Sequence, residues 1–265
     1  MDIAMESTLV ESFPLALQAL GLSMARVVGC VFFIPAFGRR HMTMVHRNAI
    51  SLAIALPQCR TLWNLLQNLS TTEVPMIALA FKESVIGCIL GLMLATPFWA
   101  FQSASTLVDN QRGANAAQQT NPSLQADASI LGELAERALI AFLFEAGVFG
   151  SFLDVLTDSY GLWPVLSPLP DLSPHARAAV LAACSRIFAD ALIYGGPVIL
   201  LLLVIEAAVA LASVTVQGLD AYQTAIPVKS LAALMMLALC FGAMLVHAGG
   251  SIESWWIDGV LSAFR

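Results

Sequence analysis

The sequence predicts an all-α membrane protein with about six long, partly kinked hydrophobic helices, and three observations support this fold class. The chain of 265 residues is 58% hydrophobic but only 11% charged, which leaves too few polar side chains to cover a water-soluble domain. Its mean hydropathy is +0.81. Apolar stretches long enough to span a bilayer recur along the chain. This composition excludes intrinsic disorder, and the net charge of −6 excludes the basic surface of a typical nucleic-acid-binding protein.

The expected helices occupy six apolar stretches that are separated by polar or Pro/Gly-containing segments. They cover roughly residues 13–37, 49–69, 75–108, 130–156, 176–216 and 226–247. The third and fifth stretches are too long for single perpendicular spans at about 1.5 Å of rise per residue, so they must tilt, kink or break. Because proline removes a helical hydrogen bond and glycine eases bending, Pro97 and the tripeptide Gly195-Gly196-Pro197 are the candidate break points.

Two further groups of residues suggest local roles. Trp255 and Trp256 follow the last stretch and suit the aromatic belt at a membrane–water interface. The cysteines are odd in number and widely spaced in apolar runs, which favours small packing residues over disulfides or metal ligands. We therefore predict no cofactor and no metal site. These cysteines are Cys30, Cys59, Cys88, Cys184 and Cys240.

Charged residues inside the apolar stretches are the least expected feature of the sequence. At a bilayer centre such a charge costs about 2.5–3.5 kcal/mol, so each needs a partner or a polar cavity, and a lipid-facing position is disfavoured. We expect them to make contacts with other helices or other subunits. They are Arg26, Lys82, Glu83, Arg186, Asp190, Glu206 and Lys229.

Spacing suggests partners for some of these charges. Arg186 and Asp190 are four residues apart and can pair along one helix face, which would neutralise them without any further function. Lys82 and Glu83 are neighbours, so we expect them to point apart and to find partners on other helices. A Glu206–Lys229 pair between the last two helices is a further hypothesis.

Small and polar residues mark two more candidate sites. Gly87 and Gly91 have the G-x-x-x-G spacing that lets two helix backbones approach closely. An amide-rich insert then follows at residues 109–125. It is either an ordinary exposed loop or a segment within a water-filled path, where it would offer many hydrogen-bonding groups and little net charge.

These motifs together resemble the SctT/FliR family of type III secretion export-apparatus proteins. The resemblance covers nearly the whole chain, and its most specific part is the run Val108-Asp109-Asn110-Gln111-Arg112-Gly113-Ala114, preceded by Lys82-Glu83-x₃-Gly87-x₃-Gly91 and followed by Asn121-Pro122. The amino-acid sequence of this central run is more similar to the virulence-type SctT branch than to the flagellar FliR branch. One departure is residues 214–218, which lack the Arg-x-x-Pro-Gln element that many members carry.

The resemblance implies a non-enzymatic subunit of a hetero-oligomeric export gate, built from helical hairpins, in the bacterial inner membrane. Its implied partners are SctR- and SctS-like subunits, SctU- and SctV-like subunits, secreted proteins in transit, and membrane lipid, with no nucleic acid. Residues 1–160 would correspond to an SctR-like part and residues 161–265 to an SctS-like hairpin. The insert would plug the pore through Asp109, Asn110, Gln111, Arg112, Gly113, Asn115, Gln118, Gln119, Asn121 and Pro122.

Two other function classes remain as alternatives. A small-solute secondary transporter could use Arg26, Glu206 and Lys229 as a coupling site and the Gly195–Pro197 break as a discontinuous helix. An intramembrane enzyme has less support, because His41 and His46 are five residues apart and no H-E-x-x-H or G-x-S-x-G motif accompanies them.

Overall fold

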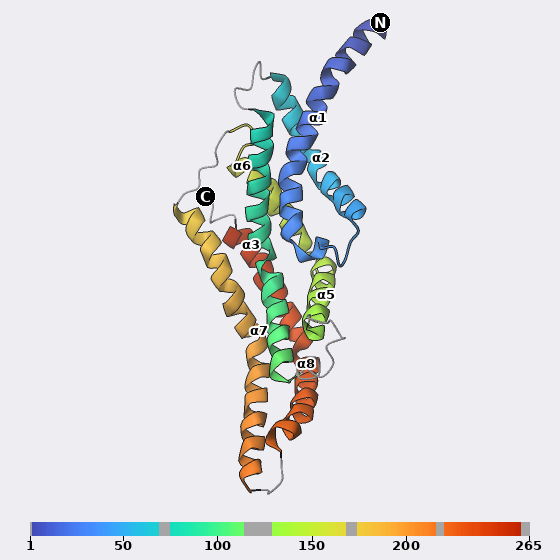
Figure 1. The fold of residues 1–265 in the computed structure, drawn as a ribbon. Coiled ribbons are helices and arrows are strands. Elements are labelled where there is room, and N and C mark those ends of the chain that lie inside the picture. Colours follow the sequence, from blue (N-terminus) through green and yellow to red (C-terminus); the bar gives the residue numbers. More distant parts are fainter. Residues whose placement is uncertain (1, 69–74, 114–128, 168–173, 216–219, 261–265) are drawn as a thin grey trace. The chain divides into compact units, whose positions relative to one another are not determined.

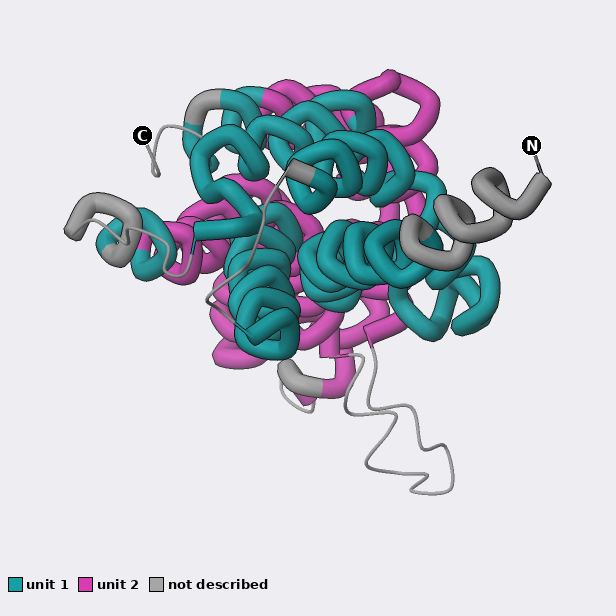
Figure 2. The backbone as a smooth tube through the Cα atoms, turned by 90° about the horizontal axis from the view of Figure 1, so that it is seen from above, with its two compact units in different colours: residues 1–95, 149–181, 254–265 teal, residues 96–148, 182–253 magenta. Residues whose placement is uncertain are grey.

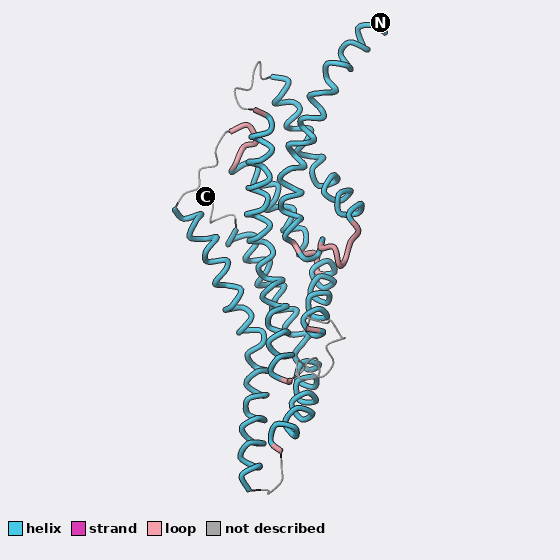
Figure 3. Tube along the Cα trace, viewed as in Figure 1, coloured by secondary structure: helices cyan, strands magenta, loops and turns pink. Residues whose placement is uncertain are grey.

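The computed structural model describes residues 2–68, 75–113, 129–167, 174–215 and 220–260. Helices are the only regular elements in these described ranges (Figures 1 and 3). The predicted all-α class is therefore confirmed, with seven α-helices in the described ranges where about six were expected. They are α1 (Asp2–Phe33), α2 (Met44–Asn68), α3 (Met76–Gln111), α5 (Ile130–Glu145), α6 (Phe149–Leu162), α7 (Pro174–Thr215) and α8 (Ala221–Ser254). Two short helices of other types accompany them, the 3-10 helix η1 (Pro35–Phe37) and the π-helix η2 (Trp255–Val260).

The extra helix arises because the fourth apolar stretch is divided. Helix α5 begins at a cap in which Ser129 Oγ accepts a hydrogen bond from Gly132 N. It ends at Glu145 with Ala146 as its C-cap, and Gly147 then has a φ of +74°, a conformation that glycine adopts without steric cost. Helix α6 then begins at Phe149, so the apolar stretch is bent at this break. Hydropathy alone did not reveal this corner, because the residues on both sides of it are apolar.

Four helical segments are long and apolar enough to cross a membrane, and the bent α5–α6 pair could act as a fifth. Helix α2 is not among them, because Gln58, Arg60 and Asn64 lower the hydropathy of the second predicted stretch. The four segments are Phe13–Phe33, Met76–Gln111, Ala178–Thr215 and Gln223–Ile257.

Neither of the two long helices breaks at its proline. Helix α3 continues through Pro97 and α7 continues through Pro197. In α3, Pro97 has no N–H to donate to the Met93 carbonyl four residues earlier. Trp255 Nε1 donates to that carbonyl oxygen over 3.1 Å, so an indole supplies a hydrogen bond where proline cannot.

The neighbouring tryptophan makes a similar contact. Trp256 Nε1 donates to Leu94 O over 3.2 Å, and its ring contacts Phe149 and Phe152. Trp256 is fully buried. The expectation that this residue lies in an interfacial belt was therefore wrong: it packs inside the protein.

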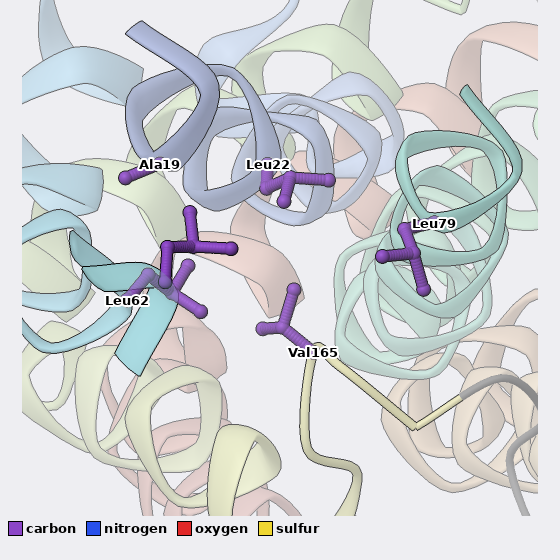
Figure 4. Close-up of a cluster of buried hydrophobic side chains, with 6 residues drawn as sticks. Ala19, Leu22, Leu62, Leu79 and Val165 are labelled. Atoms are coloured by element: carbon purple, nitrogen blue, oxygen red, sulfur yellow. The ribbon is translucent and has the colours of Figure 1, made fainter. Parts of the chain in front are cut away.

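The chain forms two compact units, each of which is discontinuous in sequence (Figure 2). Unit 1 comprises residues 1–95, 149–181 and 254–265, and unit 2 comprises residues 96–148 and 182–253. Unit 1 has an apolar core in which side chains of α1, α2 and α3 meet Val165; Figure 4 shows Ala19, Leu22, Leu62, Leu79 and Val165. In unit 2, Val198 and Leu202 of α7 pack with Ala233 and Leu237 of α8, which joins these two helices as a hairpin.

Candidate functional site

In unit 1, helix α1 and the first part of α3 approach each other at three glycines. A Cβ on Gly87 would overlap the carbonyl oxygen of Arg26, and a Cβ on Gly91 would overlap that of Cys30. From the α1 side, a Cβ on Gly29 would lie 2.6 Å from Ser84 O. Because the opposing atoms belong to the backbone, no side-chain rotation could relieve these overlaps. The predicted glycine positions thus lie where two backbones touch.

Arg26 lies directly beside this contact and is fully buried. Its Nε donates to Glu83 Oε2 over 2.6 Å, its Nη1 to Ser159 Oγ over 3.1 Å, and its Nη2 to Trp163 O over 2.8 Å. The guanidinium carbon also lies 4.1 Å from the centre of the Tyr160 ring, a cation–π distance. The guanidinium therefore has partners on α3, on α6 and just beyond α6.

Lys82 extends the same cluster. Its Nζ donates to the carbonyl oxygens of Pro164, Val165 and Ser167 over 2.7–3.1 Å. It also lies 2.9 Å from Glu83 Oε1, so the expectation that these neighbours would point apart was wrong. The flexible lysine stem lets the ammonium fold back beside the adjacent carboxylate.

The cluster of Arg26, Lys82 and Glu83 carries two cations and one anion, with the carboxylate fully buried. Both cations bind backbone carbonyls in the segment that follows the C-terminus of α6, where free carbonyls and the helix dipole favour positive charge. The cluster thereby fixes residues 163–167 against α1 and α3. Its chemistry is structural, because every polar contact is a hydrogen bond or an ion pair within the protein.

Asp109 forms a second buried site, in unit 2. Its Oδ1 accepts from Arg112 Nε over 2.7 Å, while its Oδ2 accepts from Ser129 Oγ over 2.5 Å and from Leu131 N over 3.0 Å. Asp109 is 2% exposed. One carboxylate thus joins the last turn of α3 to the first turn of α5.

The rest of the predicted insert lies around this carboxylate or outside the described residues. Asn110 is exposed, and Gln111 and Arg112 are partly exposed. Gly113 has a φ of +85° and ends α3 at a point where an added Cβ would lie 3.4 Å from Ile226. Residues 114–128 are not described, and this range contains Asn115, Gln118, Gln119, Asn121 and Pro122.

The other four charged residues predicted to lie inside apolar stretches form two ion pairs in unit 2. Arg186 Nε lies 3.0 Å from Asp190 Oδ2 along α7. Lys229 Nζ of α8 lies 3.2 Å from Glu206 Oε2 of α7. The Lys229 side chain is 10% exposed, whereas the Glu206 side chain is 54% exposed. No group of three metal-ligating side chains occurs among the residues that the structure describes.

Sequence reasoning missed several members of these sites. Ser129 could have been found, because a serine just before an apolar run is a typical helix N-cap. Ser159 and Tyr160 give no comparable signal. Nor do the carbonyls of residues 163–167, since backbone acceptors depend on chain path and not on residue type.

Comparison with known proteins adds an independent observation. The sequence matches the family described as "Bacterial export proteins, family 1" over residues 17–255. It is 31% identical to the Yop proteins translocation protein T of Yersinia pestis, over 86% of this chain and 87% of that protein. It is 29% identical to the surface presentation of antigens protein SpaR of Salmonella typhimurium, over 84% and 83% respectively. It is 25% identical to the flagellar biosynthetic protein FliR of Bacillus subtilis, over 91% of each chain.

Proposed function

The chain belongs to family 1 of the bacterial export proteins, and on that premise we propose that it is a non-enzymatic subunit of a type III secretion export apparatus. The match over residues 17–255 carries this proposal, because it covers nearly the whole chain. Relatives named for protein translocation, antigen presentation and flagellar biosynthesis support a role in protein export. With four membrane-spanning candidates, the protein is a multi-pass protein of the bacterial inner membrane.

A virulence-type system fits the comparisons better than a flagellar one. The translocation and antigen-presentation relatives are 31% and 29% identical to this chain, against 25% and 22% for two flagellar proteins. The amino-acid sequence of the Asp109–Gly113 run favours the same branch.

The exposed apolar surface supports a role inside a larger assembly. The membrane-spanning windows of α1 and α3 bury 44% and 50% of their residues, whereas those of α7 and α8 bury only 11% and 17%. The α7–α8 hairpin therefore needs an apolar environment, which lipid and neighbouring subunits can both supply. We propose SctR- and SctS-like subunits as its direct partners and SctU- and SctV-like subunits as further ones, with residues 1–160 SctR-like and residues 161–265 SctS-like.

We further propose that the insert at residues 109–125 restrains the pore of this assembly until a secreted protein is threaded through. The contacts of Asp109 support this role, because its carboxylate joins the start of the insert, at Asp109 and Arg112, to Ser129 and Leu131 just after its end. A plug held at both ends can leave and re-enter a pore without losing its position. The low net charge of the insert would let it occupy a narrow aqueous path.

The experiment is a deletion of residues 115–119 in the full complex. Leakage of ions and small molecules across the inner membrane should rise while the complex still assembles. A deletion in the 216–219 connection, matched in size as far as possible, serves as the control and should leave permeability unchanged. Equal permeability of the insert deletion and the wild type would argue against a plug.

The transporter alternative loses its main structural support. Helix α7 continues through Gly195-Gly196-Pro197, so the discontinuous helix that this function would use does not form there. Arg26, one of the three suggested coupling residues, already has an anion and two other hydrogen-bond acceptors. No described feature of the site therefore favours solute transport over the export role.

A further inference from the structure

Glu206 places a carboxylate on a surface that is otherwise apolar. It lies on α7, and its side chain is 54% exposed. Leu203 and Val204 on the same turn of α7 are exposed, as are Val228 and Leu231 on α8. A half-exposed charge in such surroundings indicates that lipid is not its neighbour, because hydrocarbon offers the carboxylate no hydrogen-bond donor.

The hydrogen bonds of Glu206 are incomplete compared with those of Glu83 and Asp109, the two buried carboxylates described above. Lys229 Nζ lies 3.2 Å from its Oε2, and no other interaction of Glu206 occurs among the described residues. In contrast, Glu83 has a cation at each oxygen, Arg26 at 2.6 Å and Lys82 at 2.9 Å. Asp109 likewise has partners on both oxygens. Glu206 Oε1 therefore has room for one further cation.

The surface around Glu206 also suits a closely packed helix. Ala207, Ala208 and Ala210 are exposed on α7. Small residues let a second helix come close enough for van der Waals contact, which is the main attraction between helices in a membrane. The Glu206 carboxylate and the small alanine side chains thus both favour a neighbouring helix that carries a cation.

We propose that this face of α7, defined by Leu203, Val204, Glu206, Ala207 and Ala210, binds an apolar helix of another export-apparatus subunit that carries one arginine or lysine. The cation of that residue binds Glu206 Oε1 and completes a two-cation arrangement like that of Glu83. This inference rests on the proposed export function and names the chemistry of one partner contact.

The test compares variants of the full chain co-expressed with the other subunits of the apparatus. Glu206→Leu should lower the yield of the purified complex at least about tenfold, because the partner cation loses its counter-ion in a buried interface. Glu206→Gln, which keeps the shape, should lower it less. Asp190→Asn is the matched control on the same helix: its carboxylate is mostly covered and already has Arg186, so the yield should stay within about twofold of wild type.

A photo-crosslinker at Leu203 in the otherwise unchanged chain provides a second readout that does not alter Glu206. It should form an adduct with a subunit helix whose crosslinked turn contains arginine or lysine, while the same probe at the fully buried Leu202 should form none. Adducts with lipid alone, an uncharged partner turn, or a Glu206→Leu complex of wild-type yield would overturn the inference. If the wild-type chain captures no other export subunit, the proposed function itself fails.

Discussion

Replacing Gly87 with alanine should separate α1 from α3 and thereby disturb the buried Arg26–Glu83 ion pair. The new methyl group would overlap the carbonyl oxygen of Arg26, and the Arg26 Cα would lie only 3.0 Å from it. The helices must move apart by about 1 Å to restore van der Waals distance. The same displacement moves Arg26, whose Nε lies 2.6 Å from Glu83 Oε2.

The magnitude of the destabilisation follows from two contributions. Overpacking of this kind costs about 1–3 kcal/mol. If the displacement also breaks the Arg26–Glu83 pair, the cost approaches the roughly 3–5 kcal/mol of a buried charge that has lost its partner. Gly21→Ala on α1 is the matched control, because no atom lies within 4 Å of its added Cβ. There the gain in helix propensity should stabilise the protein by about 0.5–1 kcal/mol.

Thermal unfolding of the purified chain in detergent measures both variants. At about 2–4 °C per kcal/mol for a chain of this size, Gly87→Ala should lower the midpoint clearly, whereas Gly21→Ala should leave it unchanged or raise it. Equal midpoints for the two variants would refute the close helix contact. A lowered midpoint for both would show that an added methyl group is harmful even at Gly21, where no atom lies nearby, so the effect would not be specific to Gly87.

Three further predictions concern the buried polar contacts. Glu83→Gln should destabilise the chain by about 3–5 kcal/mol in the same assay, whereas Glu133→Gln should cost less than about 1 kcal/mol, because that ion pair is solvent-exposed. Asp109→Asn should increase membrane leakage in the assembled complex and lower stability by about 1.5–3 kcal/mol, because it weakens charge-assisted hydrogen bonds; wild-type permeability would contradict this. Trp255→Phe should cost about 0.5–1.5 kcal/mol beyond lost packing, and less in a Pro97→Ala background, where residue 97 regains an N–H; equal costs in both backgrounds would count against the compensation.

The helical class and the glycine contact between α1 and α3 could be predicted from the sequence because both depend on local pattern. Long uncharged apolar runs form helices where water cannot hydrogen-bond to the backbone N–H and C=O groups. This is why α3 and α8 lie close to their expected positions. The G-x-x-x-G spacing of Gly87 and Gly91 marks a backbone contact for a similar reason, since only glycine leaves room for one.

The partners of the charges could not be predicted because they depend on the path of the chain. Lys82 binds three carbonyls more than eighty positions away in sequence, and no periodicity reveals which carbonyls a turn will present. The α5–α6 corner was also hidden, because Gly147 sits between two apolar segments with no polar signal. Pro97 suggested a break because it lacks an N–H, but α3 continues through it, and Trp255, far along the chain, donates to the Met93 carbonyl that proline leaves without its helical partner.

Purification of the tagged full-length chain from solubilised inner membranes is the most direct test of the central claim that it is an export-apparatus subunit. An export-apparatus subunit should be recovered in one complex of fixed stoichiometry that contains this chain and two other small hydrophobic export proteins. Recovery of the chain alone as a uniform species that takes up a small solute after reconstitution into vesicles would contradict a role as an export-apparatus subunit.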